Sequence, residues 1–254
     1  DMPGIDLVIP DFTYLSKNRD RIRGYVITHG HEDHIGSAPY VLKELPAPMY
    51  GTRLTLALVA QKLKEHRHIE GVQMNVVEPG DLIELGAFKI EFIKVNHSIA
   101  GACALAIHTP VGTVVHTGDF KVDFTPVDGE PINLGRFAEL GRKGVLLLLA
   151  DSTNSERTGY TMSEKKVCQT FNTLFEKAEG RIIIAMFASN IHRIQSVVDS
   201  SVRFGRKVCL VGRSMVNIAR AAMQLGDLRI PEGRLISVDE IDRYEDNEIT
   251  VITT

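Results

Sequence analysis

One short segment of the chain is unusually rich in potential metal ligands: Thr28-His29-Gly30-His31-Glu32-Asp33-His34. Within six residues it carries four side chains that could bind a metal: His29, His31, Asp33 and His34. Imidazole and carboxylate together suit zinc or a similar divalent ion. His29 and His31 form a pair suited to one ion, whereas Asp33 and His34 are adjacent and can turn toward a second. A polar, solvated loop is the alternative, but this string of residue types rarely arises by chance.

The flanking residues predict that the metal-binding segment is a loop between a strand and a helix. Residues 24–28 have the composition of a short buried strand, and residues 35–45 predict a helix once Gly36 and Ser37 let the chain turn. Side chains in such a loop can converge on one point instead of alternating across a sheet. The pattern therefore favours a metal site at the end of a strand.

Length and composition bound the fold class and the compartment. The 254 residues, 44% of them hydrophobic, can bury a substantial core as one large domain or two smaller ones. A net charge of -3 and a pI near 6.3 give no overall basic signature, so contact with a nucleic acid would depend on local patches and on metal. Cys103, Cys168 and Cys209 are far apart and indicate reduced thiols, which favours a cytoplasmic protein. No apolar run reaches the roughly 18 residues of a membrane span, and no signal-peptide pattern is present.

The other segments of the N-terminal third predict ordinary structural elements and no further metal site. Residues 5–9 predict an apolar strand or loop, and the alternating positive charges of residues 17–23 indicate a solvated turn. Residues 53–67 have leucines at helical spacing and lead into a charged run that contains His66 and His68. These two histidines resemble another metal-binding pair, but no carboxylate ligand pattern accompanies them, so we do not expect them to bind metal.

From residue 74 to residue 117 the pattern changes to short strands, predicted at 74–77, 88–95, 102–108 and 113–117. The last two are joined by Pro110-Val111-Gly112, which indicates a hairpin. Two more candidate ligands follow strands, where a rigid sheet presents side chains to a loop: His97 and Asp119. Either alone would be a capping or core-edge residue, but beside the earlier cluster we expect both to bind metal.

Three further polar residues of this region have less specific interpretations. His108 and His116 lie within predicted strands, so we expect them to pack or to support the ligands. Residues 145–150 predict a continuous apolar strand, which ends at Asp151. That carboxylate is either a turn former or a support for the ligands, and the sequence leaves both readings open.

After a polar linker at 155–159, the second half alternates between strands and helices. A helix is predicted at 163–178, with Ser163 at its N-cap and Lys166 where a complete capping box would have glutamate. Further helices are predicted at 191–203 and 214–225, and strands at 182–187, 208–211, 235–238 and 249–253. The alternation implies a parallel sheet in a separate α/β domain.

Two strand-to-helix junctions of that domain, at residues 188–193 and 212–214, are expected at the same edge of the parallel sheet. Helix N-termini there offer unpaired N–H groups and positive dipole ends, which makes the edge a candidate phosphate site. Ordinary helix capping by Ser189 and Ser214 would explain the same residues.

These motifs together resemble a known family. The metal-binding segment, His97, residues 116–121 and residues 151–154 are similar to the metallo-β-lactamase fold as used by ribonuclease J, and residues 188–195 and 212–215 resemble the β-CASP domain inserted in the same family. The resemblance implies an αββα sandwich at residues 1–155 followed by a parallel-sheet α/β β-CASP domain at 156–254, both incomplete. The later two motifs favour the nuclease branch over a glyoxalase-like enzyme or a β-lactam hydrolase.

The family implies a zinc-dependent ribonuclease with two metal ions, which cleaves RNA internally and degrades it from a 5′-monophosphorylated end. On that resemblance His29, His31 and His97 hold one zinc ion, Asp33 and His34 hold the other, and Asp119 bridges them. Asp33, His34 and Asp119 are the expected catalytic residues. Ser189, His192 and Arg213 are expected to bind the RNA near its 5′ phosphate, and the resemblance also allows a homo-oligomer of the full-length enzyme.

The chain also departs from the family pattern, in which the β-CASP segment is followed by a return to the first domain that supplies further histidines. We therefore expect a truncated piece of a longer enzyme, with an incomplete second metal site and doubtful activity of its own. Two alternatives remain: a hydrolase of a small thioester or lactam, and a non-catalytic module that binds metal or RNA.

Overall fold

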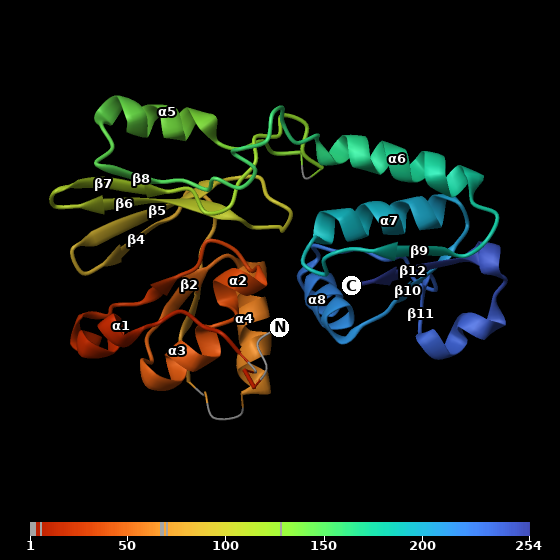
Figure 1. Ribbon diagram of the computed structural model, residues 1–254, viewed down its shortest axis with the longest axis horizontal. Coiled ribbons are helices and arrows are strands. Elements are labelled where there is room, and N and C mark those ends of the chain that lie inside the picture. The colour runs from red at the N-terminus through yellow and green to blue at the C-terminus, as the bar shows by residue number, and fades with distance from the viewer. Residues whose placement is uncertain (1–3, 6, 67–68, 70, 128) are drawn as a thin grey trace.

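The computed structural model describes residues 4–5, 7–66, 69, 71–127 and 129–254 (Figure 1). Two sheets lie within residues 25–149 and a third within residues 182–253; the N-terminal and C-terminal parts of the chain that they define are called its first and second halves below. His68 and Arg67 lie outside the described residues, as does part of the segment 5–9, whose described residues form no strand.

The first sheet has three parallel strands in the order β1-β2-β3: β1 (Tyr25–Val26), β2 (Met49–Gly51) and β3 (Met74–Val76). The helical elements around these strands are α1 (Thr13–Lys17), the 3-10 turn η1 (Arg19–Arg21), α2 (Glu32–Ile35), α3 (Ala38–Glu44) and α4 (Arg53–Glu65). Helix α4 confirms the helical spacing of its leucines, because Leu54, Leu58 and Leu63 are all buried.

Residues 24–45 differ from the sequence prediction in two respects. The strand is shorter, and the helical region starts at Glu32 and is divided between α2 and α3. Asp33 and His34 therefore lie in a helical turn, and the prediction of a loop was wrong for this pair. Gly36 lies at this break, and a Cβ atom there would lie 2.6 Å from the Glu32 carbonyl oxygen, so any other residue would require the turn to shift.

The second sheet has five strands in the order β4-β5-β6-β7-β8, antiparallel except for the parallel pair β7–β8. They are β4 (Leu82–Leu85), β5 (Phe88–Lys94), β6 (Cys103–Thr109), β7 (Gly112–His116) and β8 (Leu147–Leu149). The predicted hairpin between the third and fourth strands is confirmed, and α5 (Leu134–Lys143) connects β7 to β8. The predicted apolar strand at 145–150 is present as β8, but its three leucines are 45–59% exposed.

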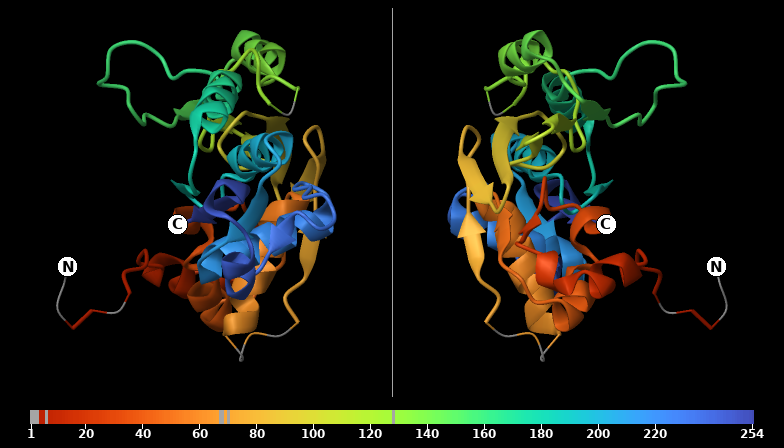
Figure 2. Two further views of the ribbon diagram at one scale, coloured as in Figure 1. Left: turned by 90° about the vertical axis from the view of Figure 1, so that its right-hand side faces the viewer. Right: turned by 90° about the vertical axis from the view of Figure 1, so that its left-hand side faces the viewer.

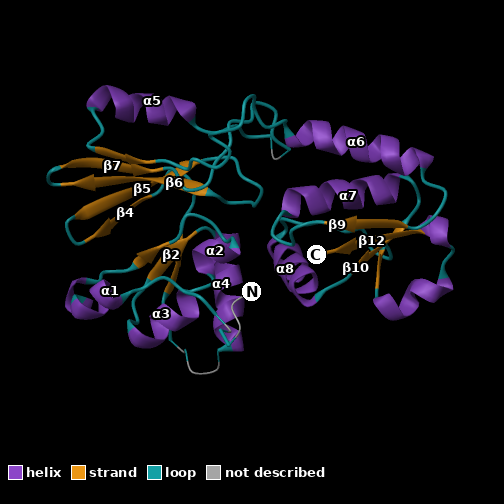
Figure 3. Ribbon diagram, viewed as in Figure 1, coloured by secondary structure: helices purple, strands orange, loops and turns teal. Residues whose placement is uncertain are grey.

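The two sheets pack face to face with helices outside both. A buried cluster that includes Phe92, Cys103 and Leu105 of the larger sheet packs against Val26 and Tyr50 of the smaller one. Helix α5 lies over the outer face of the larger sheet, and α1, α3 and α4 lie beyond the smaller sheet (Figure 1; Figure 3). The expected αββα sandwich is confirmed.

The second half contains one parallel sheet in the order β11-β10-β12-β9, as the βα alternation predicted. Its strands are β9 (Ile182–Ala185), β10 (Lys207–Leu210), β11 (Leu235–Ile236) and β12 (Ile249–Thr253), and its helical elements are α6 (Glu164–Lys177), α7 (Ile191–Arg203), α8 (Arg213–Leu225), η2 (Val238–Arg243) and η3 (Asp246–Glu248). Ser163 accepts a hydrogen bond from the Lys165 amide, so the predicted N-cap is confirmed.

The two halves are in contact through α4 and α8, and one buried apolar cluster contains side chains from both halves. The segment between β8 and α6 extends away from the rest of the chain (Figure 2). The domain boundary at residues 155/156 stays a prediction. No helix in the described part of the chain is long and apolar enough to cross a membrane.

Candidate metal centre

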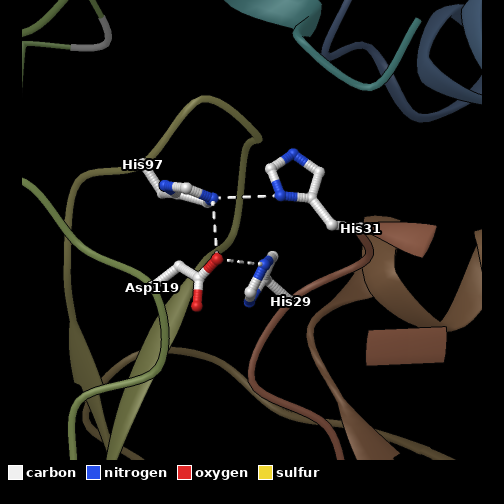
Figure 4. Close-up of side chains that lie close together, drawn as sticks. All are labelled: His29, His31, His97 and Asp119. Carbon is white, nitrogen blue, oxygen red and sulfur yellow. Dashed lines mark hydrogen bonds and ion pairs between the residues drawn. The ribbon is translucent and has the colours of Figure 1, made fainter. Parts of the chain in front are cut away.

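Six side chains predicted from the sequence gather at one end of the packed sheets. They come from four places in the chain: His29 and His31 after β1, Asp33 and His34 on α2, His97 after β5, and Asp119 after β7. Four of them, His29, His31, His97 and Asp119, surround a common centre (Figure 4). The fold thus brings together residues up to ninety positions apart in the sequence.

The first group consists of His29, His31, His97 and Asp119, whose candidate ligand atoms all lie within 4.8 Å of one another. The His31 Nδ1–His97 Nε2 distance is 3.0 Å, and Asp119 Oδ2 lies 3.6 Å from His29 Nε2 and 3.7 Å from His97 Nε2. Tetrahedral zinc with bonds of about 2.0–2.2 Å separates its ligand atoms by about 3.3–3.6 Å. The group is therefore close to the size of a tetrahedral site.

The second group consists of Asp33, His34 and Asp119. His34 Nε2 lies 3.4 Å from Asp33 Oδ2 and 3.4 Å from Asp119 Oδ1. Asp119 thus presents Oδ2 to the first group and Oδ1 to the second, which is the arrangement of a bridging carboxylate. The second group is more open, because it has three members and the Asp33 side chain is 76% exposed.

Burial keeps the histidines of the first group in the neutral form that metals bind. The pKa of His29 is lowered to about 2, first by burial and then by the neighbouring imidazoles of His34, His97 and His31. The pKa of His97 is lowered to about 4, again chiefly by burial, and the carboxylates of Asp119 and Asp151 only partly oppose this.

The environment of His29 fits a cation. Its Nε2 atom is buried without a hydrogen-bond partner, since the 3.6 Å distance to Asp119 is too long for one and a neutral imidazole makes no ion pair. Its Nδ1 atom lies 3.1 Å from the Thr28 hydroxyl oxygen. When Nδ1 carries the proton, Nε2 aims a lone pair toward the carboxylate, and a divalent cation between them satisfies both groups.

Glycine allows the Asp119 loop to approach the β1 loop. Gly118 has φ +57°, and a Cβ atom there would lie 2.9 Å from the Cys103 carbonyl oxygen and 3.2 Å from Thr28 Cβ. An L side chain at this position would be strained both by its backbone conformation and by these contacts. The chain can therefore place Asp119 beside His29 because residue 118 is glycine.

The remaining polar residues of this region have supporting contacts. His116 Nδ1 accepts a hydrogen bond from the Gly118 amide, and Asp151 accepts one from the Thr153 amide and a long one, of 3.5 Å, from the Phe120 amide. Asp151 thus both forms a turn and contacts the segment that carries Asp119. His108 lies away from the two groups, beside Thr113 and Glu91.

Two hydroxyl groups that were not predicted from the sequence lie beside the histidines, those of Thr28 and Ser98. Ser98 Oγ lies 3.3 Å from His31 Nε2, as Thr28 Oγ1 lies beside His29. Each is adjacent in sequence to a candidate ligand, and this adjacency was the available signal.

The candidate phosphate residues lie on more than one surface. Ser189 lines a groove of about 780 Å³ together with Arg193 and Ser214, and Arg213 begins α8 next to Ser214. His192 instead lines a cavity shared with His97 and Lys121. The capping alternative is wrong for both serines, because α7 is capped by the Asn190 side chain and α8 is preceded by Gly212.

Comparisons with known proteins agree with this architecture. A family model described as "Beta-lactamase superfamily domain" matches residues 3–136, and one described as "Ribonuclease J, beta-CASP domain" matches residues 179–254. A crystal structure of a protein of unknown function from Enterococcus faecalis V583 superposes with a TM-score of 0.65 at 16% identity, over 91% of this chain and 58% of that one, which shows the fold alone.

Curated relatives match along essentially the whole chain. The ribonuclease J of Helicobacter pylori is 46% identical over 99% of this chain and 37% of its own length. Those of Synechocystis and Thermus thermophilus are 44% identical over 100% of this chain, and over 40% and 45% of their own lengths. The chain thus spans less than half of the length of these relatives. With its sandwich, its parallel sheet and its His/Asp cluster, the chain belongs to the ribonuclease J family of the β-lactamase superfamily.

Proposed function

We propose that this chain carries the metal centre of a zinc-dependent ribonuclease that hydrolyses RNA phosphodiester bonds, both internally and in the 5′-to-3′ direction from an end. One observation carries the proposal: two groups of candidate ligands share the Asp119 carboxylate, with one oxygen facing each group. Family membership supports a nuclease rather than a hydrolase of a thioester or lactam.

In this proposal His29, His31 and His97 hold one zinc ion, Asp33 and His34 hold a second, and Asp119 contacts both. Paired divalent ions supply an activated water and neutralise charge on a phosphodiester. The chain's own contribution is preorganisation. Neutral imidazoles keep their lone pairs available, and the rigid ends of β5 and β7 fix His97 and Asp119 before substrate arrives.

The substrate in this proposal is RNA, preferably with a 5′-monophosphorylated end. Ser189, His192 and Arg213 are the proposed contacts. The groove lined by Ser189 and Arg193 supports the assignment of Ser189, since hydroxyl and guanidinium groups suit phosphate. Arg193 already pairs with Glu164, at 2.8 Å, so its charge is partly used within the chain.

We also propose a domain boundary, a cellular location and an oligomeric state for the natural protein. We place the boundary between the metallo-β-lactamase and β-CASP domains at residues 155/156, and we propose a cytoplasmic protein, which the three free cysteines support. A homo-oligomer of the natural protein is also proposed.

The test uses the natural protein that carries this sequence. We expect it to cleave a 5′-monophosphorylated RNA oligomer, to lose that activity in a strong chelator, and to regain it with zinc. The variant Asp119→Ala should be inactive, whereas His66→Ala should retain activity, because His66 belongs to neither candidate group. Unchanged cleavage by the Asp119 variant, or cleavage of a thioester or lactam in place of RNA, would refute the proposal.

A further inference from the structure

Asn96 is a buried side chain with no role in the site described so far. It follows β5, immediately precedes His97, and is 5% exposed. Its Nδ2 donates to the Glu130 carbonyl oxygen at 2.8 Å, and its Oδ1 accepts from the Ile132 amide at 2.7 Å. One side chain therefore ties the end of β5 to an irregular segment thirty-odd residues later in the chain.

The main chain of the same residue makes a second connection. The Asn96 carbonyl oxygen accepts a hydrogen bond from the Lys121 amide at 2.8 Å, and the two residues form an isolated antiparallel bridge. His97 lies one residue after Asn96, and Asp119 lies two residues before Lys121. Asn96 thus links the two segments whose side chains meet at His97 Nε2 and Asp119 Oδ2, 3.7 Å apart (Figure 4).

From this geometry we propose that Asn96 is a positioning residue. Its side chain anchors the start of the His97 loop to residues 130–132, and the main-chain bridge to Lys121 carries that anchoring to the Asp119 segment at the first metal site. The inference rests on the proposed metal centre. Metal–ligand distances must hold within about 0.2 Å, so a small displacement of either loop changes the affinity of the site. The Asn96 side chain resists that displacement because both its polar ends are satisfied by main-chain groups.

Loss of this side chain should not unfold the chain. The Asn133 amide also donates to the Lys94 carbonyl oxygen at 3.1 Å, so the irregular segment keeps a second attachment to β5. The bridge between Asn96 and Lys121 uses the Asn96 carbonyl oxygen and the Lys121 amide, so it does not depend on the side chain at position 96. A variant at this position therefore tests placement of the ligands rather than their presence.

The experiment compares Asn96→Leu and Asn96→Ala with the wild-type chain and a control variant. Leucine keeps the branching of the asparagine side chain but makes no hydrogen bonds, and alanine serves if the larger leucine prevents folding. The control is Asn75→Ala. The Asn75 side-chain amide likewise donates to a main-chain carbonyl oxygen, that of Met49, but Asn75 belongs to neither ligand group. The measurements are thermal unfolding, the affinity for the first equivalent of Co²⁺, and the visible absorption of the bound Co²⁺.

We expect all variants to unfold at a lower temperature than the wild-type chain. Only the Asn96 variants should bind Co²⁺ about 10- to 100-fold more weakly and with an altered spectrum, because this is the usual effect of losing a group that orients metal ligands. Wild-type affinity within twofold and an unchanged spectrum in both Asn96 variants would overturn the inference and leave the metal centre intact. Failure of the wild-type chain to bind Co²⁺ would instead refute the proposed function on which the inference rests.

Discussion

The substitution Asp119→Ala tests the shared carboxylate at the centre of both ligand groups. It removes one of four candidate ligands from the first group and one of three from the second. The binding free energy of zinc at structural sites with four ligands is about 10–16 kcal/mol, which is about 2.5–4 kcal/mol per ligand. Since about 1.4 kcal/mol is a tenfold change, each site should bind zinc roughly 60- to 700-fold more weakly.

The assay is a titration of the metal-free chain with zinc against a competing chelator, which resolves two binding steps. Asp33→Ala is the matched control, because Asp33 belongs to the second group alone and its loss should weaken only one step. His66→Ala, outside both groups, should change neither. If Asp119→Ala weakened only one step, or weakened both no more than His66→Ala did, the carboxylate would not be shared and the two-site account would be wrong.

Three further predictions follow from the geometry of the chain. Gly118→Ala should destabilise the fold by at least about 1–2 kcal/mol, because alanine is strained at φ +57°; urea unfolding at wild-type stability would contradict this. In the natural protein, Ser189→Ala or Arg213→Ala should reduce the kinetic preference for 5′-monophosphorylated over 5′-hydroxyl RNA without changing metal content. A preserved preference would refute the assignment of that residue to the phosphate site. Without metal, the chain should lose about 3 kcal/mol of its free energy of unfolding as the pH falls from 7.5 to 5.5. The pKa values of His29 and His97 are lowered in the folded state, so below about pH 6.5 these two histidines take up protons in the unfolded state only. Equal stability at both pH values would contradict those shifts.

The residue types of the candidate site were predictable because chemistry is concentrated in a short segment. His29, His31, Asp33 and His34 are unusual together, and His97 and Asp119 each follow a strand whose alternating pattern is clear. Their separation into two groups was also expected. The orientation of the Asp119 carboxylate toward both groups depends on the Gly118 conformation, which a sequence pattern does not specify.

The parts of the fold that sequence reasoning missed are short or lack a clear period. No strand was predicted at 49–51 or at 82–85, where three or four residues give too little alternation, and no helix was predicted for α5. The exposure of the β8 leucines could not be inferred, because an apolar run alone does not say which faces of a strand are covered. Asn96 was missed because its role comes from partners more than thirty residues away.

Crystals of the zinc-loaded chain, measured at the zinc absorption edge, would test the metal centre most directly. We expect one strong anomalous peak about 2.0–2.2 Å from His29 Nε2, His31 Nδ1, His97 Nε2 and Asp119 Oδ2, and a weaker one between Asp33, His34 and Asp119 Oδ1. A strong peak elsewhere in the chain, with no density at the first group, would contradict the assignment of this cluster as the metal centre.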